Sequence, residues 1–301
     1  MTFYLKHPEL ILRTQAIHMK KDIFILILVL IGIPVFGTGK QQQKDTLQVE
    51  YRTEKSIPYR DAVKEKLNEY AIQNCQLDFY YPVNKKAFAT VVWMHGGGLT
   101  GGRKEIPEIL MKRGFAVIGI AYRLSPQVKC KIIIEDAAAA VAWAFRNVAS
   151  YGGDTTQIYL SGHSAGGYLD LMVSMDKKWL APYHIDPNRI AGILPLSPQT
   201  ITHFEIRKER GIRDTQPVVD EYAPLFHVRA DLPPLVLIIG DRELEMLGRY
   251  EENAYLARMM KLNGHKQTSL YELQGFNHVT MLQPGLYLLV EQLKELIRSK
   301  R

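Results

Sequence analysis

Apolar residues along the chain fall into two kinds of stretch: short continuous runs, and longer segments in which they recur at helical spacing. Continuous runs such as 89–94 and 235–239 are typical of strands buried on both faces, as in a parallel sheet covered by helices. The pattern predicts strands at 76–81, 89–94, 115–121, 157–161, 190–196, 234–239 and 268–273. It predicts helices at 58–71, 104–113, 132–150, 165–176, 248–263 and 286–299.

The order of these elements defines the fold class. Strands that alternate with helices predict an α/β fold, in which a mostly parallel, twisted sheet carries helices on both faces. A loop at 82–86 has room for a hairpin between the first two strands, so we expect the sheet to be antiparallel at one edge. Residues 199–232 break the rhythm because they are polar and irregular. A connection of that length is typical of a lid or substrate-binding segment.

The N-terminal region has the pattern of a secretory signal peptide. Lys20 and Lys21 precede an apolar run at 23–36, and small residues follow up to Gly39. The run is short for a membrane span, although an uncleaved anchor is the alternative. We therefore expect a natural start at Met19, cleavage near Gly39, and a secreted or periplasmic protein. Residues 1–39 are then extension and signal, 40–57 a flexible lead-in and 58–301 the folded domain.

Composition and charge exclude some functions and leave others open. The chain is 47% hydrophobic and 23% charged, as expected of a globular protein with a sizeable core. Its formal net charge is +7, but the basic residues are dispersed and form no block with aromatics, which argues against a nucleic-acid partner. Cys75 and Cys130 are too few for a disulfide framework, and whether they pair is left open.

A candidate nucleophile lies between a strand and a helix. The segment Gly162-His-Ser-Ala-Gly-Gly167 follows the predicted strand 157–161 and opens the predicted helix at Ala165. This is the context of the G-x-S-x-G elbow, a tight turn that points a serine hydroxyl out of the sheet beside a helix N-terminus. The flanking glycines let neighbouring backbone approach closely. The pattern predicts that Ser164 is a nucleophile.

A glycine run indicates a site for an oxyanion. His95-Gly-Gly-Gly98 follows the predicted strand 89–94 directly. Consecutive glycines cost conformational entropy, and backbone N–H groups that point at a substrate oxygen are a reason to accept that cost. We expect Gly97 and Gly98 to donate hydrogen bonds to the oxyanion, together with the N–H of Ala165 just after the nucleophile.

These motifs, in this order, resemble the α/β-hydrolase superfamily, and within it the carboxylesterase group related to hormone-sensitive lipase. The resemblance covers roughly residues 75–300. It rests on Leu77-Asp-Phe-Tyr-Tyr-Pro82, His95-Gly-Gly-Gly98, Ala121-Tyr-Arg-Leu-Ser-Pro126, the stretch Asp136 to Asp154 with Trp143, Asn147 and Tyr151-Gly-Gly-Asp154, and Gly162 to Gly167. It implies the α/β-hydrolase fold and a serine esterase activity. We expect the irregular stretch 199–232 to be a small lid on this fold.

The family order of serine, acid and then histidine points to His278 as the base. Gly275-Phe-Asn-His278 follows the predicted strand 268–273 and precedes the last helix, where the family places its histidine. An imidazole with a pKa near neutrality takes the serine proton and returns it to the leaving group. Of the remaining histidines, His203 and His227 fall in the expected lid and are the next candidates for substrate contact.

The acid is less clearly marked. The predicted strand 234–239 is followed by Gly240-Asp-Arg-Glu243, whereas related enzymes often read Gly-x-x-Asp. The position three residues after Gly240, which holds Asp in that pattern, is Glu243 here, so we favour Glu243 as the acid. Asp241 is the second candidate, since either residue type serves as the acid. Asp136 and Asp154 precede the nucleophile in sequence, and we interpret both as structural.

The expected function is a serine carboxylic-ester hydrolase that acts through an acyl-enzyme on short-chain esters, with acetyl or feruloyl groups on carbohydrate as candidate substrates. No cofactor or metal is expected, because the chain has no H-E-x-x-H, Cys-x-x-Cys or post-strand G-x-G-x-x-G pattern. A lipase is less favoured because the lid carries the charged run 207–210. The motifs also leave open an arylformamidase-like amidase and a non-catalytic binding protein of the same fold.

Overall fold

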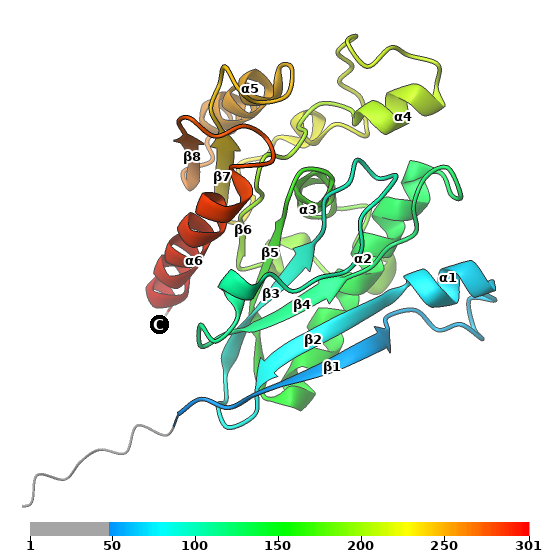
Figure 1. The fold of residues 1–301 in the computed structure, drawn as a ribbon, viewed down its shortest axis with the longest axis vertical. Helices are drawn as coiled ribbons and strands as arrows, with labels where there is room; N and C mark the ends of the chain where they lie inside the picture. The colour runs from blue at the N-terminus through cyan, green and yellow to red at the C-terminus, as the bar shows by residue number, and fades with distance from the viewer. Residues whose placement is uncertain (1–47, 301) are drawn as a thin grey trace, which may run out of the picture. The chain divides into compact units, whose positions relative to one another are not determined.

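The structure, a computed structural model, describes residues 48–300. The predicted extension and signal at 1–39, and the start of the lead-in at 40–57, lie outside the described residues. Within the described part, one sheet of eight strands has the order β1-β2-β4-β3-β5-β6-β7-β8 (Figure 1). The strands are β1 Tyr51–Pro58, β2 Gln76–Pro82, β3 Phe88–Met94, β4 Ala116–Ile120, β5 Gly153–Gly162, β6 Gly192–Ile193, β7 Leu235–Gly240 and β8 Thr268–Leu273.

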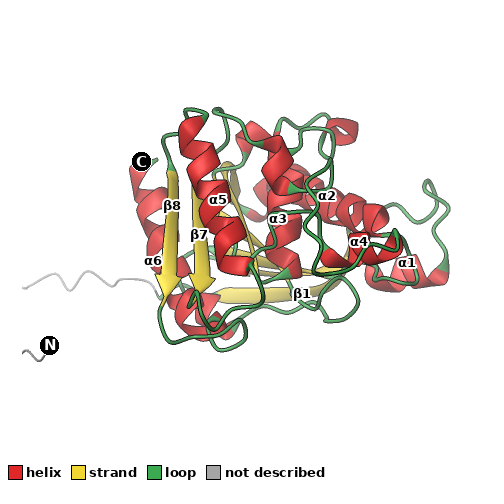
Figure 2. Ribbon diagram, turned by 90° about the horizontal axis from the view of Figure 1, so that it is seen from above, coloured by secondary structure: helices red, strands yellow, loops and turns green. Residues whose placement is uncertain are grey.

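The pairing of the strands confirms a mixed sheet that is antiparallel at one edge. Strand β2 pairs antiparallel with both β1 and β4, whereas the pairs from β4 through β3 to β8 are parallel. The expected hairpin at 82–86 is wrong, because β4 lies between β2 and β3. Figure 2 shows the twist of the sheet, with β1 running across the direction of β7 and β8. Strand β6 is also shorter than the predicted 190–196.

Strand β1 is a correction to the predicted lead-in. Residues 51–57 belong to an edge strand that pairs with β2 from Tyr51 opposite Pro82 to Pro58 opposite Gln76. Its segment 52–55 is polar, so the apolar pattern gives no strand signal there. An edge strand has one open side, and charged side chains on it discourage pairing with other chains. The polar sequence therefore reflects the position of the strand in the sheet.

Four of the predicted helices are confirmed to within a few residues, and two are wrong. Residues 58–71 become helical only from Glu69, and Val63 is 87% exposed because the preceding segment is a series of turns. Residues 104–113 contain only the short 3-10 turn Glu108–Leu110 after Pro107, whose ring removes a backbone donor. The helices are α1 Glu69–Asn74, α2 Cys130–Asn147, α3 Ala165–Met175, α4 Phe204–Glu209, α5 Arg249–Leu262 and α6 Leu282–Ser299.

Two hydrophobic cores cover the two faces of the sheet. Helices α2, α3 and α5 pack on one face, and α6 packs on the opposite face. The buried residues of α6 include Leu286, Leu289, Val290 and Leu293, the spacing of one helical face. Burying each such side chain stabilises the fold by roughly 1.5–3 kcal/mol. This layering leaves the carboxyl ends of the parallel strands as the edge where their connecting loops meet.

Both cysteines are free and buried, so Cys75 and Cys130 do not form a disulfide. Across residues 48–300, no helix is both long enough and apolar enough to span a membrane.

Candidate active site

The strand register brings the two glycine-rich motifs together. Met94, the last residue of β3, is aligned with Gly162, the last residue of β5, in the parallel ladder. The loops that begin at His95 and His163 therefore leave the same edge of the sheet side by side. Farther along the sheet, Gly240 of β7 is aligned with Leu273 of β8. The loops after β7 and β8 meet at that edge in the same way.

The turn after β5 has the strained geometry of a nucleophile elbow. Ser164 has φ 54° and ψ −112°, a positive-φ conformation that is uncommon for a residue with a Cβ. The chain crosses β3 so closely that a Cβ on Gly162 would lie 2.5 Å from the Met94 carbonyl oxygen, and one on Gly166 only 2.0 Å from it. Any side chain at either position forces the elbow away from β3. Both glycines are therefore required by close packing.

Ser164 and His278 lie together although they are far apart in sequence. The Ser164 hydroxyl donates to Nε2 of His278 over 2.9 Å. Nε2 of His163 donates to the carbonyl oxygen of His278 over 3.0 Å, so a residue of the elbow holds the loop of the base. Burial, and then the proximity of His278, lowers the pKa of His163 to about 4, which keeps this support neutral.

The acid beside His278 is Glu245, and neither predicted candidate occupies that place. Nδ1–H of His278 donates to Oε2 of Glu245 over 2.9 Å, and the Glu245 side chain is fully buried. Burial by itself raises the pKa of Glu245, but hydrogen bonds from His278 and Ser197 outweigh it and bring the pKa to about 2. Glu245 is therefore a carboxylate at neutral pH.

The predictions of Glu243 and Asp241 fail because a turn intervenes between β7 and the acid. The amides of Leu244 and Glu245 both donate to the Asp241 carbonyl oxygen, which carries Glu245 back to the sheet. Asp241 caps this turn, accepting from the amides of Glu243 and Gly275, and Glu243 is exposed. The sequence offered one signal, a further carboxylate within five residues of Gly240. Counting residues from the end of the strand could not show where the turn would place Glu245.

A second residue that the sequence reasoning missed is Ser197, which lies between the acid and the base. Its hydroxyl donates to Oε1 of Glu245 over 2.7 Å and lies 2.8 Å from Nδ1 of His278. Ser197 follows the short strand β6 and has no exposed surface. No motif in the sequence marks it.

The loop after β3 supplies free backbone donors beside the nucleophile. Gly97 and Gly98 have φ values of 117° and 64°, and a Cβ on Gly96 would lie 3.6 Å from Cβ of Ser164. In the described part of the chain, the N–H groups of Gly97, Gly98 and Ala165 donate to no protein acceptor. These are the three donors predicted for an oxyanion hole.

His95 anchors this loop. Its ring stacks on Tyr122 at 4.2 Å between centroids, and the Tyr122 hydroxyl donates to the His95 carbonyl oxygen over 2.6 Å. Burial lowers the pKa of His95, so the ring is neutral at neutral pH. The first residue of the motif is thus structural, and it fixes the path of the glycines that follow.

The segment 199–232 is tied to the body of the domain by hydrogen bonds that are buried or partly buried. Ser125 donates to Glu205 of α4 over 2.8 Å, and the amide of Cys130 donates to Glu209 over 2.9 Å. Farther along, the Tyr168 hydroxyl donates to the Tyr222 carbonyl oxygen over 2.8 Å. These contacts hold the segment 199–232, the roof of the site, against the rest of the domain.

The charged run 207–210 does not lie wholly on the surface as its sequence suggests. Arg207 is only 2% exposed, and its Nη1 donates to the carbonyl oxygens of Asp214 and Gln216. His203 is buried at the N-cap of α4, where its Nδ1 accepts from the Glu205 amide, and His227 donates to the Glu221 carbonyl oxygen. Neither lid histidine contacts the triad.

A cavity of about 890 Å³ lies between this roof and the loop that carries the acid. Phe204, in its lining, is the nearest neighbour of a Cβ built on Gly98, at 2.9 Å, and Met246, also in its lining, directly follows Glu245. The cavity therefore adjoins residues next to the oxyanion loop and the acid, and its lining does not include Ser164, His278 or Glu245. Its apolar lining consists mainly of Ile201, Phe204, Pro217, Met246, Leu247 and Tyr255.

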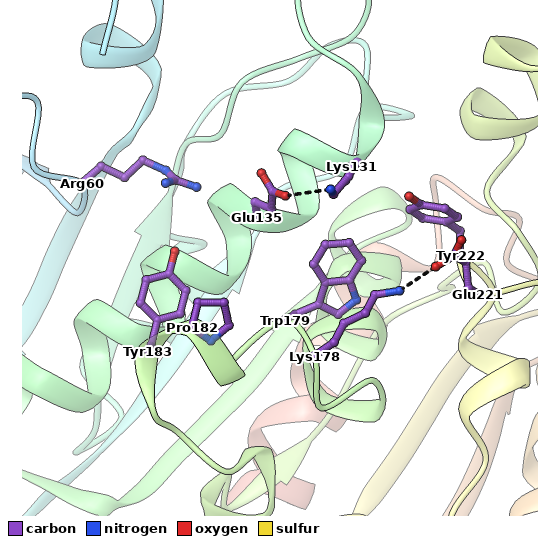
Figure 3. A pocket seen from close by; sticks show the side chains of 9 residues that line it. All are labelled: Arg60, Lys131, Glu135, Lys178, Trp179, Pro182, Tyr183, Glu221 and Tyr222. Atoms are coloured by element: carbon purple, nitrogen blue, oxygen red, sulfur yellow. Dashed lines mark hydrogen bonds and ion pairs between the residues drawn. The ribbon is translucent and has the colours of Figure 1, made fainter. Parts of the chain in front are cut away.

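A second cavity, of about 630 Å³, likewise has no triad residue in its lining (Figure 3). Lys131 and Glu135 of α2 form one ion pair there, and Lys178 and Glu221 form another. Lys178 also lies over the Trp179 ring, with its Nζ 4.8 Å from the centroid. Arg60, the remaining charged residue of the lining, pairs with Glu65 and Asp136 outside it, so each charged side chain of this cavity has a partner.

The two aspartates interpreted as structural are confirmed in that role. Asp136 is fully buried and pairs with Arg60 and Arg123, and Asp154 accepts from the Thr156 amide in a turn. Within residues 48–300, no cluster of three or more His, Cys, Asp or Glu side chains is arranged to hold a metal ion.

The strand order, the elbow and the Ser164–His278–Glu245 chain together define the α/β-hydrolase class of fold. Within that class, residues 77–191 match the family model BD-FAE. The match covers the oxyanion loop and the nucleophile elbow and ends before the acid and the base.

Comparison with known proteins agrees with this assignment. A probable isoprenylcysteine alpha-carbonyl methylesterase, ICMEL1, of Oryza sativa subsp. japonica is 37% identical over 99 residues, which cover 31% of this chain and 23% of that protein. Esterase LipC of Mycobacterium tuberculosis is 26% identical over 204 residues, 62% of this chain and 50% of the relative. The chain thus spans half or less of the length of these curated relatives.

Among solved structures, a truncated carbohydrate esterase from gut microbiota has the same fold. It superposes with a TM-score of 0.67 at 18% identity, over 83% of this chain and 97% of that one.

Proposed function

We propose that this protein is a serine carboxylic-ester hydrolase that acts through an acyl-enzyme. One observation carries the proposal: the Ser164 hydroxyl donates to His278, and the opposite nitrogen of His278 donates to the buried carboxylate of Glu245. A serine is a weak nucleophile by itself and needs such a base, held in the right tautomer, to be activated.

The first half of the proposed reaction forms the acyl-enzyme. Nε2 of His278 takes the Ser164 proton as Oγ attacks the ester carbonyl carbon, and the carbonyl oxygen becomes an oxyanion. The N–H groups of Gly97, Gly98 and Ala165 stabilise that charge, each typically contributing about 3–4 kcal/mol to the barrier reduction. The imidazolium then gives its proton to the leaving alcohol as the tetrahedral intermediate collapses.

The second half releases the acid. Water enters in place of the alcohol, His278 takes one of its protons, and hydroxide attacks the acyl carbon of the Ser164 ester. Collapse of the second intermediate returns the proton from His278 to Ser164. Throughout, Glu245 keeps Nδ1 of His278 protonated and stabilises the imidazolium, and it remains a carboxylate.

For substrates, we propose short acyl esters, including acetyl or feruloyl groups linked to carbohydrate. Two things support this class. The chain matches BD-FAE over 77–191, and a solved carbohydrate esterase has the same fold. Segment 199–232, beside the cavity, is also held by polar contacts, rather than by an apolar face that would open for long chains. We further place the chain, on its HGGG and GHSAGG motifs, in the group related to hormone-sensitive lipase.

The test is hydrolysis of p-nitrophenyl acetate, butyrate and octanoate by the full chain, beside Ser164→Ala. We expect faster turnover of acetate and butyrate than of octanoate. In Ser164→Ala we expect turnover to fall to the residual rate that substrate binding and the oxyanion donors give without a nucleophile. Acetylated and feruloylated glycans are the next substrates. Equal rates for the wild type and Ser164→Ala would remove the serine mechanism.

Two further functions are separated by the same samples. If folded wild-type protein hydrolyses no ester but cleaves aryl formamides, it is an arylformamidase-like amidase, because the same triad cleaves amides. If it cleaves neither, a binding protein of the hydrolase fold becomes the favoured function.

We also propose that the protein is exported by its N-terminal segment. Lys20, Lys21 and the apolar run at 23–36 support this. N-terminal sequencing of the protein from the extracellular or periplasmic fraction of expressing cells is the test, and a mature start just after Gly39 is the expected result. An intact N-terminus in the membrane fraction would instead indicate an uncleaved anchor.

A further inference from the structure

We propose that Ser197 is a positioning residue of the triad: its hydroxyl joins the carboxylate of Glu245 to the imidazole of His278 and holds both in the geometry that activates Ser164. The inference rests on the proposed serine-hydrolase function and deepens it. Ser197 stays protonated and forms no bond to substrate, so its role is exerted through the acid and the base.

The contacts of the hydroxyl define this role. Ser197 Oγ donates to Oε1 of Glu245 over 2.7 Å, whereas Nδ1 of His278 donates to Oε2 of Glu245 over 2.9 Å. The same Oγ lies 2.8 Å from Nδ1 of His278 and can accept a share of that proton. Ser197 thus binds Oε1 of the carboxylate, and His278 binds Oε2. Rotation of the carboxylate would break both hydrogen bonds.

The backbone holds Ser197 in place on both sides. Its φ of 45° is left-handed, and its amide donates to the Ile238 carbonyl oxygen over 2.7 Å. Its carbonyl oxygen accepts from Nη1 of Arg249 over 2.7 Å, and Arg249 is itself buried and paired with Glu252. A non-glycine residue in this conformation persists only when its surroundings enforce it. These contacts hold the backbone of Ser197, and with it the base of its side chain, at the edge of the sheet.

The position of the acid explains why such a residue is needed. Glu245 arrives on a turn after β7, and its own backbone neighbours supply only two amides, those of Gly240 at 3.2 Å and Met246 at 3.0 Å. Among the described residues, Ser197 is the one side chain that hydrogen-bonds Glu245 and also lies within hydrogen-bonding distance of His278. Without it, the carboxylate keeps its charge and its two amide contacts but loses the shortest of its hydrogen bonds, the one that also joins it to the base.

The experiment compares Ser197→Ala and Ser197→Gly with Ser161→Ala in the full chain. Ser161 is the matched control, because it is a fully buried serine whose hydroxyl donates one hydrogen bond, to the Leu194 carbonyl oxygen at 2.7 Å. Glycine at 197 also lacks the hydroxyl but tolerates the left-handed backbone, so it separates the hydroxyl from strain. The readouts are kcat and KM on p-nitrophenyl acetate, and the rate at which a fluorophosphonate labels Ser164.

We expect both Ser197 variants to lose roughly 10- to 100-fold in kcat, the factor of a hydrogen bond to a charged group, with KM unchanged. The labelling rate of Ser164 falls by a similar factor, and Ser161→Ala keeps the wild-type values. In a Glu245→Gln background, Ser197→Ala costs much less, because the two residues act as a unit.

Wild-type kcat and labelling rate in both folded Ser197 variants would overturn the inference, as would a full additional loss in the Glu245→Gln background. If Ser197→Ala does not fold, Ser197→Gly decides alone. A wild-type protein that neither hydrolyses esters nor reacts with the fluorophosphonate would instead overturn the proposed function. The labelling rate distinguishes the two failures because it reports Ser164 activation without any choice of ester.

Discussion

At the scale of single residues, the site depends on two side chains that no motif marks. Glu245 reaches His278 only because a turn capped by Asp241 returns the chain to Gly240, where a Cβ would lie 3.0 Å from the Glu245 side chain. The nearest acidic candidate in strand register, Glu243, is left in solvent. Hydrogen bonding, rather than the spacing of carboxylates along the chain, thus selects the acid.

Glu245→Gln is therefore expected to lower kcat on p-nitrophenyl acetate by roughly 10³- to 10⁴-fold, as the loss of the acid does in other triads. The amide keeps the volume but cannot stabilise the imidazolium, and it permits the wrong tautomer of His278. Glu243→Gln is the control and leaves kcat at the wild-type value. A large loss in Glu243→Gln with none in Glu245→Gln would restore the acid predicted from register.

At the scale of elements, the site consists of loops whose paths are set by the strands before them. The alignment of Met94 with Gly162 fixes the distance between the oxyanion loop and the elbow. Within the first loop the backbone itself is crowded, since a Cβ on Gly97 would lie 2.2 Å from the Gly101 carbonyl oxygen. The glycine there is needed both for φ of 117° and for this close approach.

Gly97→Ala is expected to displace the loop and lower kcat roughly 10²- to 10³-fold, as the loss of an oxyanion donor does. Gly101→Ala is the matched control from the same loop: its Cβ has only one neighbour within 4 Å, at 3.8 Å, and its φ is not left-handed. We expect nearly wild-type kcat for that variant. Steady-state kinetics on p-nitrophenyl acetate, with a melting curve for each variant, measure both. Equal losses in the two variants would indicate general loosening of the loop.

At the scale of the whole molecule, the fold buries three histidines and favours their neutral form. Burial lowers the pKa of His95, His163 and His203, and nearby positive groups lower it further for the last two. Each is a histidine that binds a proton more readily in the unfolded chain than in the native one. The native state is therefore favoured above the usual histidine pKa of 6.5 and loses that advantage as the pH falls toward 4.

We expect the free energy of unfolding, measured in urea, to decrease as the pH falls from about 6.5 to about 4. A histidine protonated only in the unfolded state contributes a slope of about 1.4 kcal/mol per pH unit in this window. His163→Gln, which retains a donor for the His278 carbonyl oxygen, should reduce the slope by up to that amount. His184→Gln, at an exposed histidine, is the control. An unchanged slope in His163→Gln would mean that His163 takes up its proton over the same pH range in the native state as in the unfolded chain.

The sequence by itself determined the class of fold and the chemistry at the two glycine-rich loops. Runs of apolar residues fix buried strands, and a serine or three glycines placed directly after a strand need little tertiary information to be located. His278 was predictable for the same reason, once the family order was known. These features are local, because strand, turn and helix follow one another within about ten residues.

Only the tertiary structure decided which groups complete the site. β1 gave no apolar signal because it is an edge strand, and the hairpin expected at 82–86 is replaced by the insertion of β4 between β2 and β3. The acid depends on a turn that returns Glu245 to Gly240, and Ser197 reaches it from the loop after β6. Contacts between segments so far apart leave no periodic trace in the sequence, because they arise from how the loops meet at the edge of the sheet.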